Sequence, residues 1–387
     1  MKAQPFKIEV EQSVLDDLQN RLKRTRWPDE AEGSGWSMGT NLGYLKVLAD
    51  YWQHHYDWRK HEEALNQFHQ FKTEVDGVTI HFIHERGKGP NPMPIILTHG
   101  WPDSVYRFHK VIPMLTDPER YGGKAEDSFD VIVPSIPGFG FSDRQAMPDG
   151  RVANLWAKLM TEVLGYEHFA AAGGDVGSMV TKALALQHPN VVTAIHLTDV
   201  GYPTGMEDPA TLSEAERQFA GFIQQWWFTE GAYAMIQSTK PQSLAYGLND
   251  SPVGLAAWIM SFICIGTTGE EIEKRFSRDE LLTNIMIYWL TETAGSSARR
   301  YRVDNIQRAR ATYGHSGGPQ PAQKSEVPAA VAVCPWDAPV PREWAERNVN
   351  LKRYSEMPRG GHFLAWEEPE LYANDVREFV TELHRSR

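Results

Sequence analysis

The first seventy residues carry a helical pattern of apolar positions. Apolar side chains recur there at steps of three or four residues, so each of two stretches can bury one face of a helix. The first stretch has Val14, Leu15, Leu18 and Leu22, and the second has Leu45, Leu48, Trp52 and Tyr56. Ser13, followed three residues later by Asp16, predicts a capping box at the first helix. We expect residues 1–70 to pack on the rest of the chain as a helical segment without chemistry of its own.

Strand patterns begin at Phe71. Two runs with strand character, 71–75 and 78–84, flank Asp76 and Gly77, a pair that strongly predicts a hairpin turn. Short apolar runs follow at 95–98, 129–133, 168–172 and 191–197, and segments of helical length separate them. Strands that alternate with helices form a mostly parallel sheet. The sequence therefore predicts an α/β fold from residue 71 onward.

The pattern changes twice more toward the C-terminus. Residues 204–313 are helical in character and rich in Trp, Tyr and Met, whereas 314–325 has the composition of a loop. Strands are then predicted at 327–334 and 350–354, with a final helix near 368–384. We interpret 204–313 as a helical cap inserted into the sheet domain. This divides the chain into an N-terminal segment (1–70), a first core part (71–203), the cap (204–313) and a second core part (314–387).

Composition narrows the possible partners. The 387 residues suit one large α/β domain with an insertion, or two domains, and a formal net charge of −11 disfavours nucleic acid and anionic membranes. The two cysteines, Cys264 and Cys334, lie in apolar runs, which indicates buried free thiols in a reducing compartment. The N-terminus has no apolar signal region, and the apolar stretch at 253–266 is too short to span a bilayer. We therefore expect a cytoplasmic protein that binds neither nucleic acid nor membrane.

Asp175 occupies the position where a serine esterase keeps its nucleophile. An apolar run, Phe169-Ala-Ala-Ala-Gly-Gly174, leads into Asp175-Val-Gly177 and then into a helix-forming segment. This strand, sharp turn and helix match the G-x-S-x-G elbow of α/β-hydrolases, with Asp in place of Ser. A serine attacking a saturated carbon would form an ether, whereas a carboxylate forms an ester that water can attack at the carbonyl. The elbow predicts an α/β-hydrolase that accepts an alkyl group from an sp³ carbon and then hydrolyses the ester.

The remaining triad members follow in the chain order nucleophile, acid, histidine. His362 lies in a Gly-flanked loop before the last helix, and Asp337 follows the strand predicted at 327–334. Asp337 would orient the imidazole and stabilise the imidazolium. Its rival is Glu343, which falls inside a predicted helix. We interpret another histidine, His99, as a structural residue that shapes its loop.

Two backbone N–H groups are needed to hold an oxyanion in such a site. One is expected directly after the nucleophile, at Val176, and the other in the loop after an early strand. The run Ile95-Ile-Leu-Thr-His-Gly-Trp101 supplies that strand and loop. Trp101 is the predicted donor, because Pro102 has no N–H.

The chain resembles the microsomal-type epoxide hydrolases, a branch of the α/β-hydrolases, along nearly its whole length. The matching segments are Thr25-Arg-Trp-Pro28, His99-Gly-Trp-Pro102, Pro134-Ser-Ile-Pro-Gly-Phe-Gly-Phe-Ser142, Gly173-Gly-Asp-Val-Gly177, Gly247-Leu-Asn-Asp-Ser-Pro-Val-Gly-Leu-Ala256 and Gly360-Gly-His-Phe363. The family uses two cap tyrosines to donate hydrogen bonds to the epoxide oxygen, and the resemblance points to Tyr233 and Tyr301. Spacing alone leaves Tyr246 open as a rival of the first, and Tyr288 and Tyr313 as rivals of the second.

The resemblance implies an enzyme that converts a hydrophobic epoxide and water to a vicinal diol, with no cofactor and no metal. A haloalkane dehalogenase also uses an Asp elbow, but it needs halide-binding Trp or Asn side chains. A third alternative is a catalytically silent hydrolase-fold protein that binds a lipophilic metabolite. The sequence leaves open whether the role is detoxification or secondary-metabolite biosynthesis, whether a homodimer forms, and whether the cluster Trp226-Trp-Phe228 is core or pocket.

Overall fold

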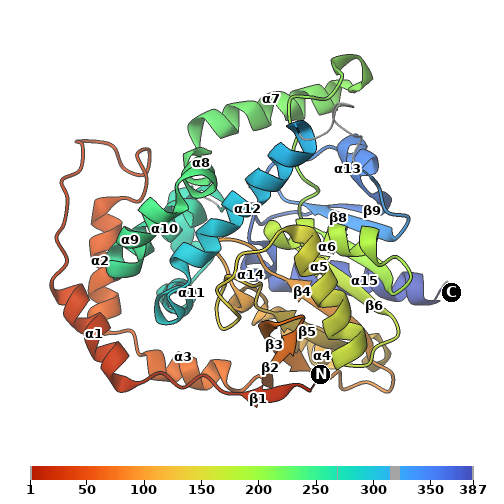
Figure 1. Cartoon of the computed structure of the whole chain (residues 1–387), viewed down its shortest axis with the longest axis horizontal. Helices are drawn as coiled ribbons and strands as arrows, with labels where there is room; N and C mark the ends of the chain where they lie inside the picture. The colour runs from red at the N-terminus through yellow and green to blue at the C-terminus, as the bar shows by residue number, and fades with distance from the viewer. Residues whose placement is uncertain (1, 268, 314–322, 386–387) are drawn as a thin grey trace.

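The computed structural model describes residues 2–267, 269–313 and 323–385. Within this part of the chain, nine strands form one sheet in the order β1-β2-β3-β5-β4-β6-β7-β8-β9 (Figure 1). The strands are β1 (Gln4–Phe6), β2 (Gln70–Val75), β3 (Val78–Glu85), β4 (Met93–Thr98), β5 (Phe129–Pro134), β6 (Phe169–Gly173), β7 (Val192–Leu197), β8 (Pro328–Val333) and β9 (Asn350–Glu356). β1, β2, β3 and β5 pair antiparallel in that order, and the pairs from β5 to β9 are parallel. The predicted mostly parallel sheet and the hairpin between β2 and β3 are confirmed.

Alternate side chains of the strands enter two hydrophobic cores on opposite faces of the sheet. In β4, Ile96 enters one core, whereas Ile95 and Leu97 enter the other, because successive strand side chains point to opposite faces. Helices α5 and α6 cover the first face, and α4 and α15 cover the second (Figure 1). The helices of the core are α4 (Val111–Thr116), α5 (Asp149–Lys158), α6 (Val176–Gln187), α13 (Arg342–Asn348), α14 (Leu364–Glu367) and α15 (Pro369–Arg385). Short 3₁₀ or π turns are η1 (Val105–Phe108), η2 (Pro118–Tyr121), η3 (Ala125–Asp127), η4 (Leu159–Val163), η5 (Pro209–Thr211) and η6 (Gly269–Lys274).

Helices α7 to α12 build the region expected to be a cap. They are α7 (Glu214–Thr229), α8 (Ala232–Thr239), α9 (Pro241–Asp250), α10 (Pro252–Ile265), α11 (Arg278–Thr291) and α12 (Ala294–Tyr313). Hydrogen bonds attach two of these helices to core loops. Asn284 on α11 donates to the Pro102 carbonyl at 2.7 Å, and Ser296 on α12 donates to the Gly138 carbonyl at 2.6 Å. These bonds fix the cap helices relative to the loops at the carboxyl ends of the strands.

The N-terminal segment lies along the cap as well as the core. Its helices are α1 (Gln12–Lys23), α2 (Leu42–His54) and α3 (Trp58–Leu65). α1 and α2, at the left of Figure 1, contact α10, and α2 also contacts α11. Arg21 of α1 pairs with Asp250 at the end of α9 at 2.8 Å. β1 joins the edge of the sheet, so this segment bridges the two parts of the molecule.

Some local predictions for this segment are wrong. The N-cap of α1 is Glu11, so Ser13 already has helical backbone geometry and cannot form the predicted capping box with Asp16. Val14 is 39% exposed and is not part of the buried face. Tyr56 lies beyond the end of α2, and its hydroxyl pairs with that of Thr283 at 3.0 Å.

Other boundaries stay predictions. Of the loop predicted at 314–325, residues 314–322 lie outside the described part of the chain. The division at 70, 203 and 313 is likewise untested. The apolar stretch at 253–266 is α10, most of whose side chains are buried. In the described residues, no helix has the length and apolar character needed to cross a bilayer.

Candidate active site

Asp175 sits in the turn between β6 and α6. Its backbone has φ 54° and ψ −128°, a region that costs a non-glycine residue about 1–3 kcal/mol and is enriched at functional sites. The turn needs a glycine two residues later, because a Cβ on Gly177 would lie 2.0 Å from the carbonyl oxygen of Thr98. The tight approach of α6 to β4 therefore presents the Asp175 carboxylate at the carboxyl edge of the sheet.

The three residues of the predicted triad lie together. His362 Nδ1 is 3.2 Å from Asp337 Oδ2, and His362 Nε2 is 3.4 Å from Asp175 Oδ2. Both acids follow parallel strands, Asp175 after β6 and Asp337 after β8, and only β7 separates these strands. His362 is 6% exposed. Its Nε2 atom is an ion-pair partner of Asp175 but makes no aligned hydrogen bond in the described structure.

The electrostatics of the site favour a charged histidine. Burial alone would lower the pKa of His362, but the charges of Asp337 and Asp175 and the close polar contacts of both carboxylates with the ring outweigh it and raise that pKa well above its ordinary value. Burial would conversely raise the pKa of Asp337, yet the charge and hydrogen bond of His362 lower it. The resting site therefore favours an imidazolium at His362, between Asp337 and Asp175.

Trp101 contacts the nucleophile through its backbone. Its N–H donates to Asp175 Oδ1 at 2.8 Å, while Oδ2 of the same carboxylate faces His362. Val176 follows Asp175 directly as the first residue of α6. The Trp101 N–H is thus in place to hold a carboxyl oxygen, and the oxyanion role of Val176 stays a prediction.

The two predicted tyrosines contact each other and the ring of Trp101. The Tyr233 ring stacks on Trp101 with centroids 5.3 Å apart and planes 10° from parallel, and the Tyr301 ring meets Trp101 edge-on at 5.8 Å. The two tyrosine rings are 6.0 Å apart. Burial raises the pKa of both hydroxyls well above their ordinary value, and the charge of Asp175 adds to this effect. Both hydroxyls therefore keep their protons and can donate hydrogen bonds.

The rival tyrosines lie elsewhere or are already engaged. Tyr246 is 72% exposed on the outer surface of the cap. Tyr288 is buried, and its hydroxyl donates to the Asp103 carbonyl at 2.6 Å. The side chain of Tyr313 lies outside the described residues. Of the four cap tyrosines whose side chains are described here, Tyr233 and Tyr301 are the two whose rings contact Trp101.

The other open alternatives are also placed. His99 is fully buried, its Nε2 accepts from the Ile136 N–H at 3.1 Å, and its Nδ1 donates to the Gly100 carbonyl at 3.0 Å, which suits a structural role. Glu343 is exposed on α13. The cluster at 226–228 is divided, because Trp226 meets Tyr233 edge-on at 6.2 Å whereas Phe228 is 88% exposed.

Sequence reasoning missed several residues that surround the triad. Phe262 of α10 meets both Trp101 and His362 edge-on, and nothing in its apolar segment distinguishes it from core. Asp103, Arg107, Asp199 and Glu367 are buried charged residues near the site. They could have been identified in the sequence as charged residues within otherwise apolar segments, close to a predicted catalytic residue.

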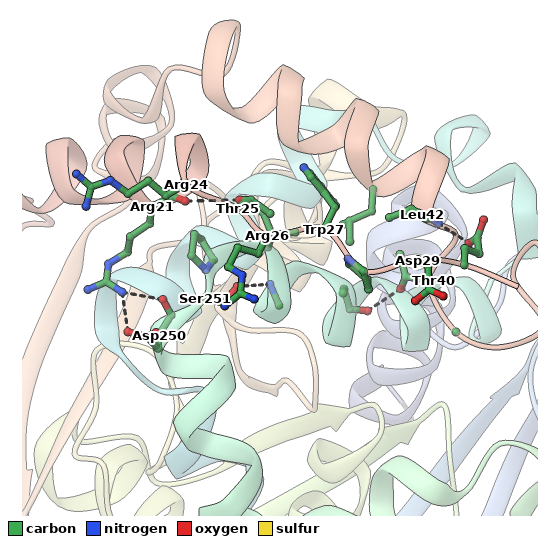
Figure 2. Close-up of a pocket in the computed structure, with 18 of the residues that line it drawn as sticks. Arg21, Arg24, Thr25, Arg26, Trp27, Asp29, Thr40, Leu42, Asp250 and Ser251 are labelled. Carbon is green, nitrogen blue, oxygen red and sulfur yellow. Dashed lines mark hydrogen bonds and ion pairs between the residues drawn. The ribbon is translucent and has the colours of Figure 1, made fainter.

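A cavity of about 810 Å³ lies away from the triad, between the loop after α1 and the start of α10 (Figure 2). Figure 2 shows Arg26 directed toward Ser251, and Arg21 bonded to Asp250. None of the seven predicted site residues lines this cavity. In the described residues, no cluster of three or more His, Cys, Asp or Glu could hold a metal, and independence from metals and cofactors stays a prediction.

Comparisons with known proteins agree with this geometry. A family model described as "Epoxide hydrolase N terminus" matches residues 3–108, and one described as "alpha/beta hydrolase fold" matches residues 93–286.

A relative from Stigmatella aurantiaca (strain DW4/3-1), named for the same family, is 45% identical over 98% of this chain and 85% of its own length. Epoxide hydrolase 1 of Oryctolagus cuniculus is 37% identical over 97% of this chain and 88% of its own length. The crystal structure of juvenile hormone epoxide hydrolase from the silkworm Bombyx mori superposes with a TM-score of 0.83 and 29% identity, covering 99% of this chain and 94% of that one. This chain therefore belongs to the epoxide hydrolase family of α/β-hydrolases, enzymes that convert an epoxide to a vicinal diol through an aspartyl ester.

Proposed function

We propose that Asp175 is the nucleophile of this epoxide hydrolase and that Tyr233 and Tyr301 activate the leaving oxygen. An oxygen of Asp175 forms a bond to one epoxide carbon while the bond from that carbon to the ring oxygen breaks. The electron pair stays on the ring oxygen, which takes a proton from the tyrosine pair, and the imidazolium of His362 restores that proton. The products of this half-reaction are a hydroxyalkyl ester and a neutral histidine.

Ester formation changes the proton affinity of His362, and the second half-reaction depends on this change. Esterification removes the charge of Asp175, one of the groups that raise the pKa of His362, so the histidine becomes a neutral base beside the ester. His362, oriented by Asp337, then takes a proton from water, and the hydroxide attacks the Asp175 carbonyl. The N–H groups of Trp101 and Val176 hold the oxyanion. Collapse expels the diol oxygen, which takes the proton of the new carboxyl group, and the resting charges are restored.

The lining of the site favours a hydrophobic epoxide. The rings of Trp101, Phe262 and Tyr233 contact one another, and the Trp101 N–H contacts the nucleophile, so an aromatic cluster lies beside the reacting carboxylate, as is typical of sites for apolar ligands. The single observation that carries the assignment of roles is the double contact of Asp175, with Trp101 N–H on one oxygen and His362 on the other. This arrangement suits a carboxylate that attacks with one oxygen and is later hydrolysed at its own carbonyl.

The test is a single turnover of excess enzyme with styrene oxide in ¹⁸O-labelled water. Label is expected in the Asp175 carboxylate and not in the diol, because water attacks the ester carbonyl. Label that enters the diol in the first cycle would overturn the covalent role of Asp175. The Asp175→Asn variant should not form diol at the normal rate. A parallel assay of halide release from a matched haloalkane distinguishes epoxide hydrolysis from dehalogenation.

Two broader properties are proposed from the composition and the surface of the chain. A cytoplasmic location is supported by the burial of both cysteines, Cys264 and Cys334, as thiols. A homodimer through the cap is supported by exposed apolar side chains on α7 to α9, among them Phe228, Met235 and Tyr246. Light scattering of the purified chain beside a Phe228→Ser variant tests the dimer, which should dissociate more readily in the variant.

A further inference from the structure

Asp103 fixes the loop that presents the Trp101 N–H. Its Oδ1 atom accepts the N–H of Gly100 at 2.6 Å, so the side chain holds the peptide between His99 and Gly100, one residue before Trp101. Its backbone carbonyl accepts the Tyr288 hydroxyl from the cap at 2.6 Å. The side chain is fully buried. Because Trp101 contacts the nucleophile, the geometry of this loop sets the position of that N–H relative to Asp175.

Arg107 connects this loop to the loop of the catalytic histidine. One terminal nitrogen pairs with Asp103 Oδ2, and the other donates to the backbone carbonyl of His362 at 2.8 Å. The guanidinium lies under the nucleophile elbow, because a Cβ on Gly174 would be 2.4 Å from Arg107 Nη2. Glycine at 174 therefore leaves the space that the guanidinium occupies. Arg107 thus contacts the segment that carries the oxyanion donor and the segment that carries the base. It also lies against Gly174, the residue before the nucleophile.

The burial of the pair argues against a role in stability alone. Arg107 is 1% exposed, and Arg107 together with His99 lowers the pKa of Asp103 to about 2, although burial by itself would raise it. A buried ion pair gains little net stability, because desolvation of both charges offsets their attraction. A planar guanidinium that makes hydrogen bonds through two of its nitrogens is instead suited to hold two chain segments in fixed relative positions.

We propose that Asp103 and Arg107 form a positioning pair for the ester-hydrolysis step, an inference that rests on the function proposed above. The pair keeps the Trp101 N–H and the His362 backbone in one frame, so that oxyanion donor and base act on the same ester. Alkylation of Asp175 needs neither the oxyanion donor nor the neutral base. Removal of the pair therefore slows the second half-reaction selectively.

The experiment measures the two steps separately in the full-length enzyme, with styrene oxide, by rapid quench and intact-protein mass spectrometry. The variants are Arg107→Lys, which keeps the charge but loses the planar fork, and the double variant Asp103→Asn with Arg107→Met, which leaves no unpaired buried charge. Arg353→Met is the control, because Arg353 pairs with Asp375 between β9 and α15, away from the triad. Thermal unfolding reports the folded fraction of each variant.

Both variants should hydrolyse the alkyl-enzyme about 10- to 100-fold more slowly, as expected for misplacement of about an ångström, while alkylation changes by less than about threefold. Alkyl-enzyme then accumulates, and kcat and KM fall together. Equal slowing of both steps, or a loss of kcat at unchanged KM, would show that the pair acts only on folding. Wild-type enzyme that forms no alkyl-enzyme would instead refute the proposed function, which separates the two failures.

Discussion

The active site has two halves that are held by different forces. The core half, with Asp175, Asp337 and His362, stands at the carboxyl ends of neighbouring strands and is fixed by hydrogen bonds and ion pairs. The cap half, with Tyr233 and Tyr301, is fixed by rings that pack on Trp101. Hydrogen bonds and charges have strict geometry, whereas ring packing tolerates changes of shape. The comparison suggests that ester hydrolysis depends on the rigid core half, and that epoxide opening and recognition of substrate shape depend on the apolar cap half.

The two halves are nevertheless not independent. Trp101 belongs to both, because its N–H contacts Asp175 while its ring contacts the tyrosines. Tyr288 and Asn284 of the cap bind backbone carbonyls of the same loop. One core loop therefore sets the height of the cap tyrosines above the nucleophile. Perturbing one half at a time should reveal which reaction step belongs to it.

The largest effect is expected from the core half, at His362→Gln. Without a base, the ester cannot be hydrolysed efficiently, and the turnover rate should fall by at least about 10⁴-fold, since replacing only the acid of a triad already has an effect of that size. Alkylation should survive for one cycle, because the tyrosine pair gives its proton to the ring oxygen directly and His362 only restores that proton afterwards, so one equivalent of substrate is consumed in a burst. Intact-protein mass spectrometry would show the mass of the wild-type protein plus one epoxide. His54→Gln, at an exposed surface position, is the control and should leave turnover unchanged.

The opposite result would break the comparison. If His362→Gln formed no alkyl-enzyme, the histidine would be needed for the first step, and the division of steps between the halves would be wrong.

A smaller effect is expected from the cap half, at Tyr233→Phe and Tyr301→Phe. Loss of one hydroxyl removes one of two donors to the leaving oxygen, and alkylation should slow by about 10²-fold, at the low end of general-acid contributions. Hydrolysis of preformed ester should be unchanged. Tyr246→Phe is the matched control, because that hydroxyl lies on the surface. Single-turnover rates of ester formation and decay separate the two steps, and a slower decay in either variant would contradict the assignment.

Much of the core half could be predicted because its signals are local. The elbow around Asp175 is predicted as strand, turn and helix from spacing alone. Chain order, the strand before Asp337 and the Gly-flanked loop of His362 then favour these two residues as acid and base, over the rival Glu343 in a predicted helix. The α/β-hydrolase fold and the epoxide hydrolase family, predicted from such segments, are confirmed. Parallel strands bring their carboxyl ends to one edge, which is why residues 25 to 187 positions apart in the chain could be placed together.

The cap half could not be predicted from spacing in the same way. Helices of a cap bury apolar faces in any of several packings, and no pattern says which of five tyrosines points inward. Only the family resemblance separated Tyr233 and Tyr301 from Tyr246. Phe262 was missed for the same reason, since α10 is apolar on nearly every face. The pairing of Asp103 with Arg107 depends on long-range contacts with His362 that local sequence does not encode.

A final prediction concerns Glu367, whose side chain binds the backbone of the loop that carries His362. Its Oε1 atom accepts the N–H groups of Gly361 and Phe363, the neighbours of His362, at 3.2 and 2.9 Å. Burial raises the pKa of this carboxyl to about 7 from an ordinary value of 4.5. A raised folded-state pKa means that the stability this group contributes is full below pH 4.5 and is lost as pH rises through 7.

Glu367→Gln keeps an acceptor for both N–H groups but cannot ionise, so it should lack this loss. Between about pH 5 and about pH 8, linkage predicts that the unfolding free energy of the wild type falls by about 2–3 kcal/mol relative to the variant. Urea denaturation at both pH values measures the difference, and contributions from His362 largely cancel in it. Glu370→Gln, an exposed position on α15, should follow the wild type. Parallel pH profiles for wild type and Glu367→Gln would mean that the carboxylate stays ionised beside the imidazolium, and the histidine loop would then be held by charge rather than by hydrogen bonds to a neutral acid.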